Sequence, residues 1–170
     1  MKSLLLYSIC FIFPFFMHAQ NSIIISVDST TGSKIFRGTF SFDSLIKEPT
    51  FTWFNTGVSD YTPNNEMIQK LSPILNKCKL VVVMGTWCED SHFLIPKLYK
   101  TLLACHFPFR ELELIGVDRE KQSVGNEREK FEIQLVPTII VFKEGKELGR
   151  IVETIKTSIE SDLLKLVVGH

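Results

Sequence analysis

The sequence predicts an α/β protein: a three-layer fold with a mixed central β-sheet and helices on both faces. Two observations lead to this class. From residue 64 onward, short apolar runs alternate with longer segments whose apolar residues recur at helical spacing, and strand–helix–strand connections place parallel strands side by side. Near the end of the chain, two apolar runs flank the turn residues Glu144-Gly145-Lys146, which predicts a hairpin and an antiparallel edge.

The composition is that of one globular domain. The chain has 170 residues, of which 45% are apolar and 22% charged, and its formal net charge is zero. Such a chain can bury a core, so disorder is not expected. Because there is no basic excess, nothing indicates a nucleic acid or an anionic membrane as a partner.

The N-terminus is typical of a secretory signal peptide over residues 1–19. Lys2 provides the positive start, an apolar stretch follows, and Ala19 offers a cleavage point. The stretch is short for a membrane span. Met17 is a poor residue for the cleavage site, so an uncleaved anchor stays an alternative. A lipid anchor on Cys10 is disfavoured, because the residues before this cysteine do not suit lipidation. We expect an exported protein, periplasmic or secreted, that contacts a membrane only if this segment is uncleaved.

Residues 20–63 are predicted to form an N-terminal extension ahead of the main domain, 64–170. We expect a strand or extended lead-in over 20–35, a second strand over 35–42, and a helical turn over 43–47. An aromatic cluster with turn residues between its members comes next. It is interpreted either as a loop pinned to the domain or as one wall of a substrate groove, and it consists of Phe51, Trp53, Phe54 and Tyr61.

The main domain is predicted from its apolar periodicity. Residues 64–76, 92–105 and 158–168 carry apolar stripes at helical spacing, and the charged segment 119–130 is expected to be a solvated helix with its connecting loop. Pro73 and Pro96 should kink their helices, or end the first one. Strands are expected over residues 80–84, 112–117, 139–143 and 148–153.

A cysteine, Cys88, stands where the strand 80–84 turns into the next helix. Free N–H groups and the positive end of the helix dipole favour its thiolate, the form that attacks disulfides. Glu89 and Asp90 oppose this effect, or else only stabilise the first helical turn. His92, one helical turn on, either stabilises the thiolate or is a surface histidine without a role. Cys88 and His92 are too few ligands for a metal.

The stretch Trp87-Cys88-x-x-Ser91, together with Val136-Pro137-Thr138 before a later strand, resembles the thioredoxin family. The resemblance covers residues 64–168 and includes the hairpin VPTIIVFKEGKELGR. It implies a thioredoxin-like fold in which Cys88 is the attacking cysteine and Trp87 flanks it. It also implies that Pro137 is a cis-proline and that Val136 offers backbone hydrogen bonds to an extended substrate.

A narrower resemblance concerns the residues before 64 and the wording GTWCEDSH. These are similar to secreted thioredoxin-like proteins of the Bacteroidetes group. This resemblance agrees with the export expected from the N-terminus.

Two positions depart from the family's pattern. Ser91 replaces the second cysteine of C-x-x-C, and Val82 stands where many members carry a buried acid. A serine hydroxyl can donate a hydrogen bond to the Cys88 thiolate, but it cannot attack a mixed disulfide to release the partner. The acid's usual task is proton transfer from the resolving cysteine, so the two losses agree with each other.

The two other thiols of the main domain, Cys78 and Cys105, lie too far along the chain from Cys88 to resolve such an adduct. The start of the strand and the end of the helix should lie at one end of the domain. Cys78 and Cys105 therefore form either a structural disulfide there or two separate free thiols.

These features predict a monothiol variant of the thioredoxin-like family, with the motif W-C-x-x-S and without a cofactor. Its expected activity, if it is an enzyme, is that of a thiol-disulfide oxidoreductase. Cys88 would form a mixed disulfide with a disulfide- or thiol-bearing protein or a small thiol, and an external thiol would resolve it. The alternative is a non-catalytic peptide-binding or scaffold protein on the same fold, because a fold does not fix a function.

Overall fold

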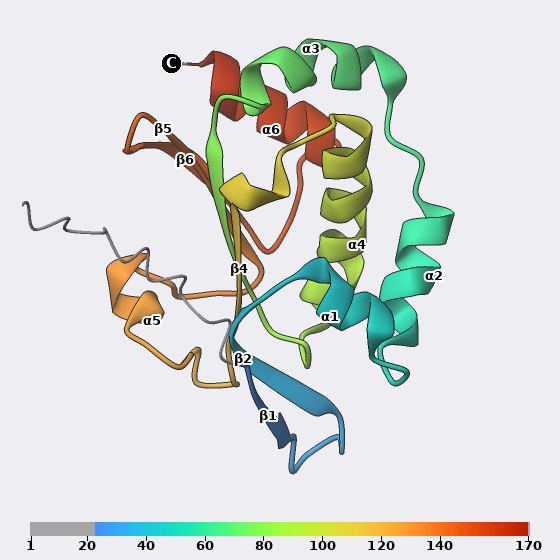
Figure 1. Cartoon of the computed structure of the whole chain (residues 1–170), viewed down its shortest axis with the longest axis vertical. Helices are drawn as coiled ribbons and strands as arrows, with labels where there is room; N and C mark the ends of the chain where they lie inside the picture. Colours follow the sequence, from blue (N-terminus) through green and yellow to red (C-terminus); the bar gives the residue numbers. More distant parts are fainter. Residues whose placement is uncertain (1–22, 170) are drawn as a thin grey trace, which may run out of the picture.

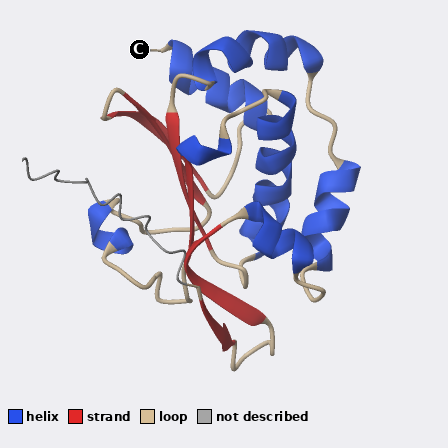
Figure 2. Cartoon of the chain, in the orientation of Figure 1, coloured by secondary structure: helices blue, strands red, loops and turns tan. Residues whose placement is uncertain are grey.

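A mixed six-stranded sheet forms the centre of the computed structural model, which describes residues 23–169 (Figures 1 and 2). Its strands lie in the order β1-β2-β4-β3-β5-β6. Only β3 and β4 pair in parallel, and all other neighbours are antiparallel. The strands are β1 (Ile24–Val27), β2 (Lys34–Phe40), β3 (Lys79–Met84), β4 (Leu112–Gly116), β5 (Thr138–Lys143) and β6 (Lys146–Val152).

Helices cover both faces of the sheet, as predicted, but unequally (Figure 1). Five pack on one face around the larger core, while the single turn α5 and the segment after it cover the other. The helices are α1 (Phe42–Lys47), α2 (Thr52–Asp60), α3 (Asn65–Leu75), α4 (Glu89–Ala104), α5 (Glu127–Lys130) and α6 (Ile159–Val168), with a 3-10 turn η1 (Phe109–Glu111).

Strand β3 is central to both layers, because its side chains alternate between the two cores. Leu80 and Val82 enter the larger core, while Val81 and Val83 enter the smaller one. This alternation is what a strand buried on both faces requires. Because β3 is buried on both faces up to its last residue, Met84, the turn that follows it starts from a fixed position.

Most elements of the main domain agree with the sequence to within a few residues. The Asn64 side chain caps α3 by accepting a hydrogen bond from the Met67 N–H at 3.1 Å. Both α3 and α4 continue past their prolines, Pro73 and Pro96. Helix α4 begins three residues earlier than predicted, at Glu89, and this places Cys88 at its N-cap.

The aromatic segment is a helix, and its interpretation as a loop was wrong. Helix α2 covers Thr52–Asp60 and packs along α4. Gly57 permits this contact, because a Cβ atom there would lie 2.8 Å from the Pro96 Cβ. Phe54 is fully buried in the larger core. The turn-forming residues of the segment therefore lie inside a helix that tertiary packing stabilises.

Residues 119–130 contain the short helix α5, none of whose four residues is buried, together with its connecting loop, as predicted. The direction of the next strand was predicted wrongly. The chain then crosses to the far side of β3, where β5 pairs antiparallel, so β4 and β5 are not the parallel neighbours that a strand–helix–strand connection predicts.

The N-terminal extension is continuous with the domain. Strand β2 pairs with β4, and Phe36, Phe40 and Phe42 enter the larger core. The predicted signal peptide, residues 1–19, lies outside the described residues. Among residues 23–169, none of the helices combines the length and the apolarity that crossing a bilayer requires.

Candidate functional site

The candidate site is built on the turn between β3 and α4. Cys88 is the N-cap of α4, and its N–H donates to the Gly85 carbonyl at 3.0 Å. Gly85 is required for a steric reason: a Cβ atom there would lie 2.6 Å from the Trp87 ring. The Trp87 Nε1–H donates to the Val117 carbonyl at 2.9 Å, which fixes the ring. The thiol is half-buried at the start of the helix.

Pro137 lies next to this thiol, although nearly fifty residues separate them in sequence. The Cys88 Sγ donates to the Val136 carbonyl at 3.2 Å, and the Val136–Pro137 peptide bond is cis. The Pro137 carbonyl accepts from the Glu153 N–H at 2.8 Å, which ties this loop to the end of β6. The thiol, the tryptophan and the proline thus form one site.

Ser91 is fully buried on the inner side of the turn. Its Oγ accepts a hydrogen bond from the Gly85 N–H at 3.3 Å, and within the described residues no hydrogen bond joins it to the Cys88 sulfur. Val82 is fully buried in β3. The two positions that depart from the family's pattern thus carry a buried hydroxyl, which supports the turn, and a buried aliphatic side chain.

The structure has Cys78 and Cys105 as free thiols in the larger core, only 2% and 0% exposed. This matches the interpretation as two separate thiols rather than a disulfide. Burial raises the pKa of Cys105 to about 11, and it also raises the pKa of Cys78. Both thiols are consequently held in the protonated, unreactive form at neutral pH.

His92 takes a position that neither sequence interpretation foresaw. Its Nε2 lies 2.8 Å from the Thr86 carbonyl oxygen, and its ring stacks on Trp53 of α2, with centroids 4.1 Å apart and planes at 17°. Thr86 in turn donates through its hydroxyl to the Lys34 carbonyl at 2.8 Å. His92 therefore connects α2, α4 and the turn that carries Cys88. Trp53 therefore supports this histidine.

Glu89 and Asp90 are exposed in the first turn of α4. Carboxylates in this place stabilise a helix through its dipole. Asp90 also lines a hollow of about 440 Å³ next to the site. The hollow is bordered by Phe93 and Lys97 of α4 and by the loop after β6, which starts at Glu153.

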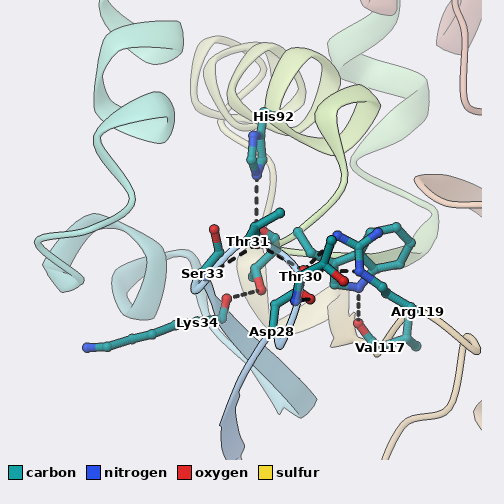
Figure 3. Close-up of polar contacts among 10 residues, drawn as sticks. Asp28, Thr30, Thr31, Ser33, Lys34, His92, Val117 and Arg119 are labelled. Atoms are coloured by element: carbon teal, nitrogen blue, oxygen red, sulfur yellow. Dashed lines mark hydrogen bonds and ion pairs between the residues drawn. The ribbon is translucent and has the colours of Figure 1, made fainter.

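The residues that the sequence analysis missed are Asp28 and Arg119 (Figure 3). Asp28, in the turn between β1 and β2, accepts through Oδ2 from Arg119 Nε at 3.0 Å and from Nη2 at 2.6 Å. The Arg119 guanidinium carbon lies 4.9 Å from the centroid of the Trp87 ring. The two partners are 91 residues apart, so no local pattern connects them. The turn-forming run that begins at Asp28 was the one available signal.

The described part of the chain contains no cluster of three or more His, Cys, Asp or Glu side chains arranged to hold a metal ion.

A thiol at a helix start, beside a cis-proline on a mixed sheet with helices on both faces, defines the class of thioredoxin-fold proteins. Compared with known protein families, the chain matches thioredoxin over residues 59–165. The chain therefore belongs to the thioredoxin family.

Curated relatives agree with this assignment. The chain is 32% identical to thioredoxin-1 of Saccharomyces cerevisiae over 76 residues, which is 44% of this chain and 68% of that protein. It is 29% identical to thioredoxin of Chlamydia muridarum over 91 residues, which is 54% of this chain and 80% of that protein.

A solved structure agrees at the level of the fold. A crystal structure of a protein of unknown function from Pseudomonas aeruginosa matches with a TM-score of 0.54 at 17% identity. The match covers 77% of this chain and 93% of that one.

Proposed function

We propose that this protein carries out thiol–disulfide exchange through the single nucleophile Cys88. The Cys88 thiolate attacks one sulfur of a disulfide. A new S–S bond joins Cys88 to that sulfur, the original S–S bond breaks, and its electron pair leaves on the second sulfur, which takes a proton from solvent. A thiolate from another molecule then attacks the mixed disulfide and returns Cys88 to the thiol.

The observation that carries this proposal is the placement of the Cys88 sulfur. It lies 3.2 Å from the carbonyl that precedes a cis-proline, it is half-buried, and it stands at the N-terminus of a sixteen-residue helix. Helix-terminal N–H groups stabilise a thiolate in this place. The other two described thiols are buried in the core.

The monothiol character follows from the residue that fills the second position. Ser91 is fully buried and accepts a hydrogen bond from the turn it supports, and a hydroxyl cannot displace a sulfur from a disulfide. The mixed disulfide therefore accumulates until an external thiol removes it. The partner class is a protein or a small molecule that carries a thiol or a disulfide.

Mass spectrometry of the intact protein after treatment with glutathione disulfide tests the proposal. We expect one glutathione adduct on the wild type, none on Cys88→Ala, and one on the matched control Cys78→Ala, whose thiol is buried. Excess dithiothreitol should remove the adduct. A Cys88→Ala protein that still forms the adduct would show that another thiol reacts.

A second candidate is a peptide-binding protein that uses the same surface without covalent chemistry. The hollow beside the site, bordered by Phe93 and Lys97, favours this candidate. Under it, a folded wild-type protein would stay unmodified by glutathione disulfide and would still retain extended peptides. The first test therefore separates the two candidates.

We also propose that the protein is exported, periplasmic or secreted. Support comes from the apolar N-terminal stretch that ends at Ala19, and from the resemblance to secreted thioredoxin-like proteins of Bacteroidetes. N-terminal sequencing of the protein from its native host measures whether this segment is removed.

A further inference from the structure

The turn between β1 and β2 places a fixed cation at the edge of the candidate site. Arg119, which follows β4, binds Asp28 of that turn through two of its nitrogens, Nε and Nη2, at 3.0 and 2.6 Å (Figure 3). Its guanidinium carbon lies 4.9 Å from the Trp87 ring centroid. Because Trp87 immediately precedes Cys88, the cation lies against the tryptophan that flanks the reactive sulfur.

Asp28 holds this arginine, and its own carboxylate is not available to a ligand. Its carboxylate also accepts from the Thr30 N–H at 2.9 Å and from the Thr31 hydroxyl at 3.0 Å. These bonds, the one from Arg119 foremost, hold the pKa of Asp28 well below its usual range. The carboxylate stays charged at any ordinary pH, with its oxygens occupied by protein donors.

The exposed side of the pair is the cation. The Asp28 side chain is 2% exposed, whereas the Arg119 side chain is 40% exposed. Both bonds to Asp28 use Nε and Nη2, and no described residue accepts a hydrogen bond from Nη1. A molecule that approaches Cys88 therefore meets guanidinium N–H groups rather than the carboxylate that holds them.

Other charged side chains also stand around the site. Lys121 adds a second cation, with its Nζ 6.0 Å from the Trp87 centroid. Glu89 and Asp90 on α4 and Glu120 beside the arginine are exposed carboxylates that oppose an anion. Exposed charges without direct contact are screened by salt, whereas the Nη1 of a guanidinium held in place can donate a charge-assisted hydrogen bond to a carboxylate. The fixed contact should therefore decide the preference.

We propose that Arg119, positioned by Asp28, is a substrate-binding residue that selects thiols and disulfides carrying a carboxylate near the sulfur, as glutathione does. This inference rests on the proposed exchange at Cys88 and adds the substrate class. In the step itself, Cys88 bonds to one sulfur of glutathione disulfide, and the other glutathione leaves with the electron pair and takes a proton from solvent. The carboxylate remains on Nη1 throughout and undergoes no chemistry.

The pKa of Arg119 agrees with this arrangement. It is raised, first by the hydrogen bonds to Asp28, with burial opposing, and further by the negative charges of Asp28, Cys88 and Glu120.

The test compares two small disulfides of opposite charge, glutathione disulfide and cystamine. Second-order rates of adduct formation at Cys88 are measured by quenched mass spectrometry for the wild type and for Arg119→Gln. We expect the ratio of the glutathione rate to the cystamine rate to fall about fivefold in Arg119→Gln. Raising the salt concentration should weaken the contact with Nη1, so the ratios of the wild type and the variant should move closer together.

Arg110→Gln is the matched control, because Arg110 stands before β4, at the other end of that strand, and its side chain is 82% exposed. Its rate ratio should equal that of the wild type. Asp28→Asn, which loosens the guanidinium without removing it, should lower the ratio by a smaller factor. Circular dichroism tests whether each variant is folded. If Arg119→Gln does not fold, Arg119→Lys replaces it. The ratio of the glutathione rate to the cystamine rate in Arg119→Lys should lie between the ratios of the wild type and of Asp28→Asn.

The outcomes separate this inference from the proposed function. A wild-type Cys88 that reacts with neither disulfide overturns both. A Cys88 that reacts with both disulfides, with an unchanged ratio in the folded Arg119 variant, leaves the exchange reaction standing and overturns the role of Arg119.

Discussion

Replacement of His92 by alanine should destabilise the protein, because the imidazole supports the turn that carries Cys88. The variant loses the contact between Nε2 and the Thr86 carbonyl, 2.8 Å long, and the stack on Trp53, with centroids 4.1 Å apart. Thr86 is only 1% exposed, so its carbonyl would be left without this partner in a largely dry place.

The magnitude follows from these two contacts. A buried carbonyl that loses its hydrogen bond costs about 1–3 kcal/mol, and an aromatic stack contributes about 0.5–1.5 kcal/mol beyond its buried area. Because local relaxation recovers part of this sum, we expect His92→Ala to lower the free energy of unfolding by about 2 kcal/mol. For a domain of this size, the melting temperature should fall by about 4–8 °C.

Urea unfolding followed by circular dichroism measures the free energy, and iodoacetamide labelling of Cys88 reports on the site. His92→Phe is the matched control, because phenylalanine keeps a ring against Trp53 but has no N–H. It should lose about half as much free energy as His92→Ala. The reasoning is refuted if His92→Ala is as stable as the wild type while the pH profile of Cys88 labelling changes. In that case the imidazole acts on the thiolate and does not support the turn.

Three further predictions concern the other thiols, the tyrosine beside α6 and the missing second cysteine. In the native protein at pH 8, iodoacetamide should leave Cys78 and Cys105 unlabelled, since burial raises the pKa of both; peptide mapping checks this, and labelling in urea is the control. Burial, and then the hydrogen bond to Glu160 at 2.6 Å, raise the pKa of Tyr61. Because folding favours the neutral phenol, the stabilisation is present below about pH 10 and is lost as the pH rises further. Tyr61→Phe should remove this alkaline loss in urea titrations between pH 8 and 11, and a loss of equal size in both proteins would count against it. Ser91→Cys should release a glutathione adduct without added thiol, which the wild type should not do; an equally persistent adduct in both would mean that the new thiol cannot reach the mixed disulfide.

The central part of the fold could be predicted because its signals are local. A few neighbouring residues are enough to predict three of its features: the apolar strand β3, the cysteine that follows it and the proline before β5. A strand buried on both faces is restricted to apolar residues. It can therefore be recognised in the sequence, and so can the turn that follows it and carries Cys88.

The errors arose where tertiary contacts outweigh local propensity. Gly57 lowers the helical propensity of α2, yet its missing side chain lets α2 approach Pro96 on α4. The buried Phe54 adds apolar contacts that the local pattern did not weigh. The direction of β5 was wrong for a similar reason, because pairing with β3 is decided across the sheet rather than along the chain.

The pairing of Asp28 with Arg119 could not be predicted from the sequence. Each residue alone looks like an ordinary surface charge in a turn. Their meeting depends on β2 joining the edge of the sheet beside β4, where Phe36 N–H and the Lys34 carbonyl also bond to the Thr86 hydroxyl. Only the assembled sheet brings the turn after β1 to the site.

The pairing of β2 with β4 also sets an order of events during folding. The contacts that close this edge join residues 50 to 91 positions apart, and contacts of long sequence separation form slowly because a long loop must close first. The turn that carries Cys88 depends on the same closure, because the Thr86 hydroxyl bonds to β2 and the Trp87 ring bonds to the Val117 carbonyl after β4. A polypeptide whose synthesis has not yet passed Val117 therefore cannot hold the tryptophan in place beside the thiol. The site is completed together with this edge of the sheet, and not before it.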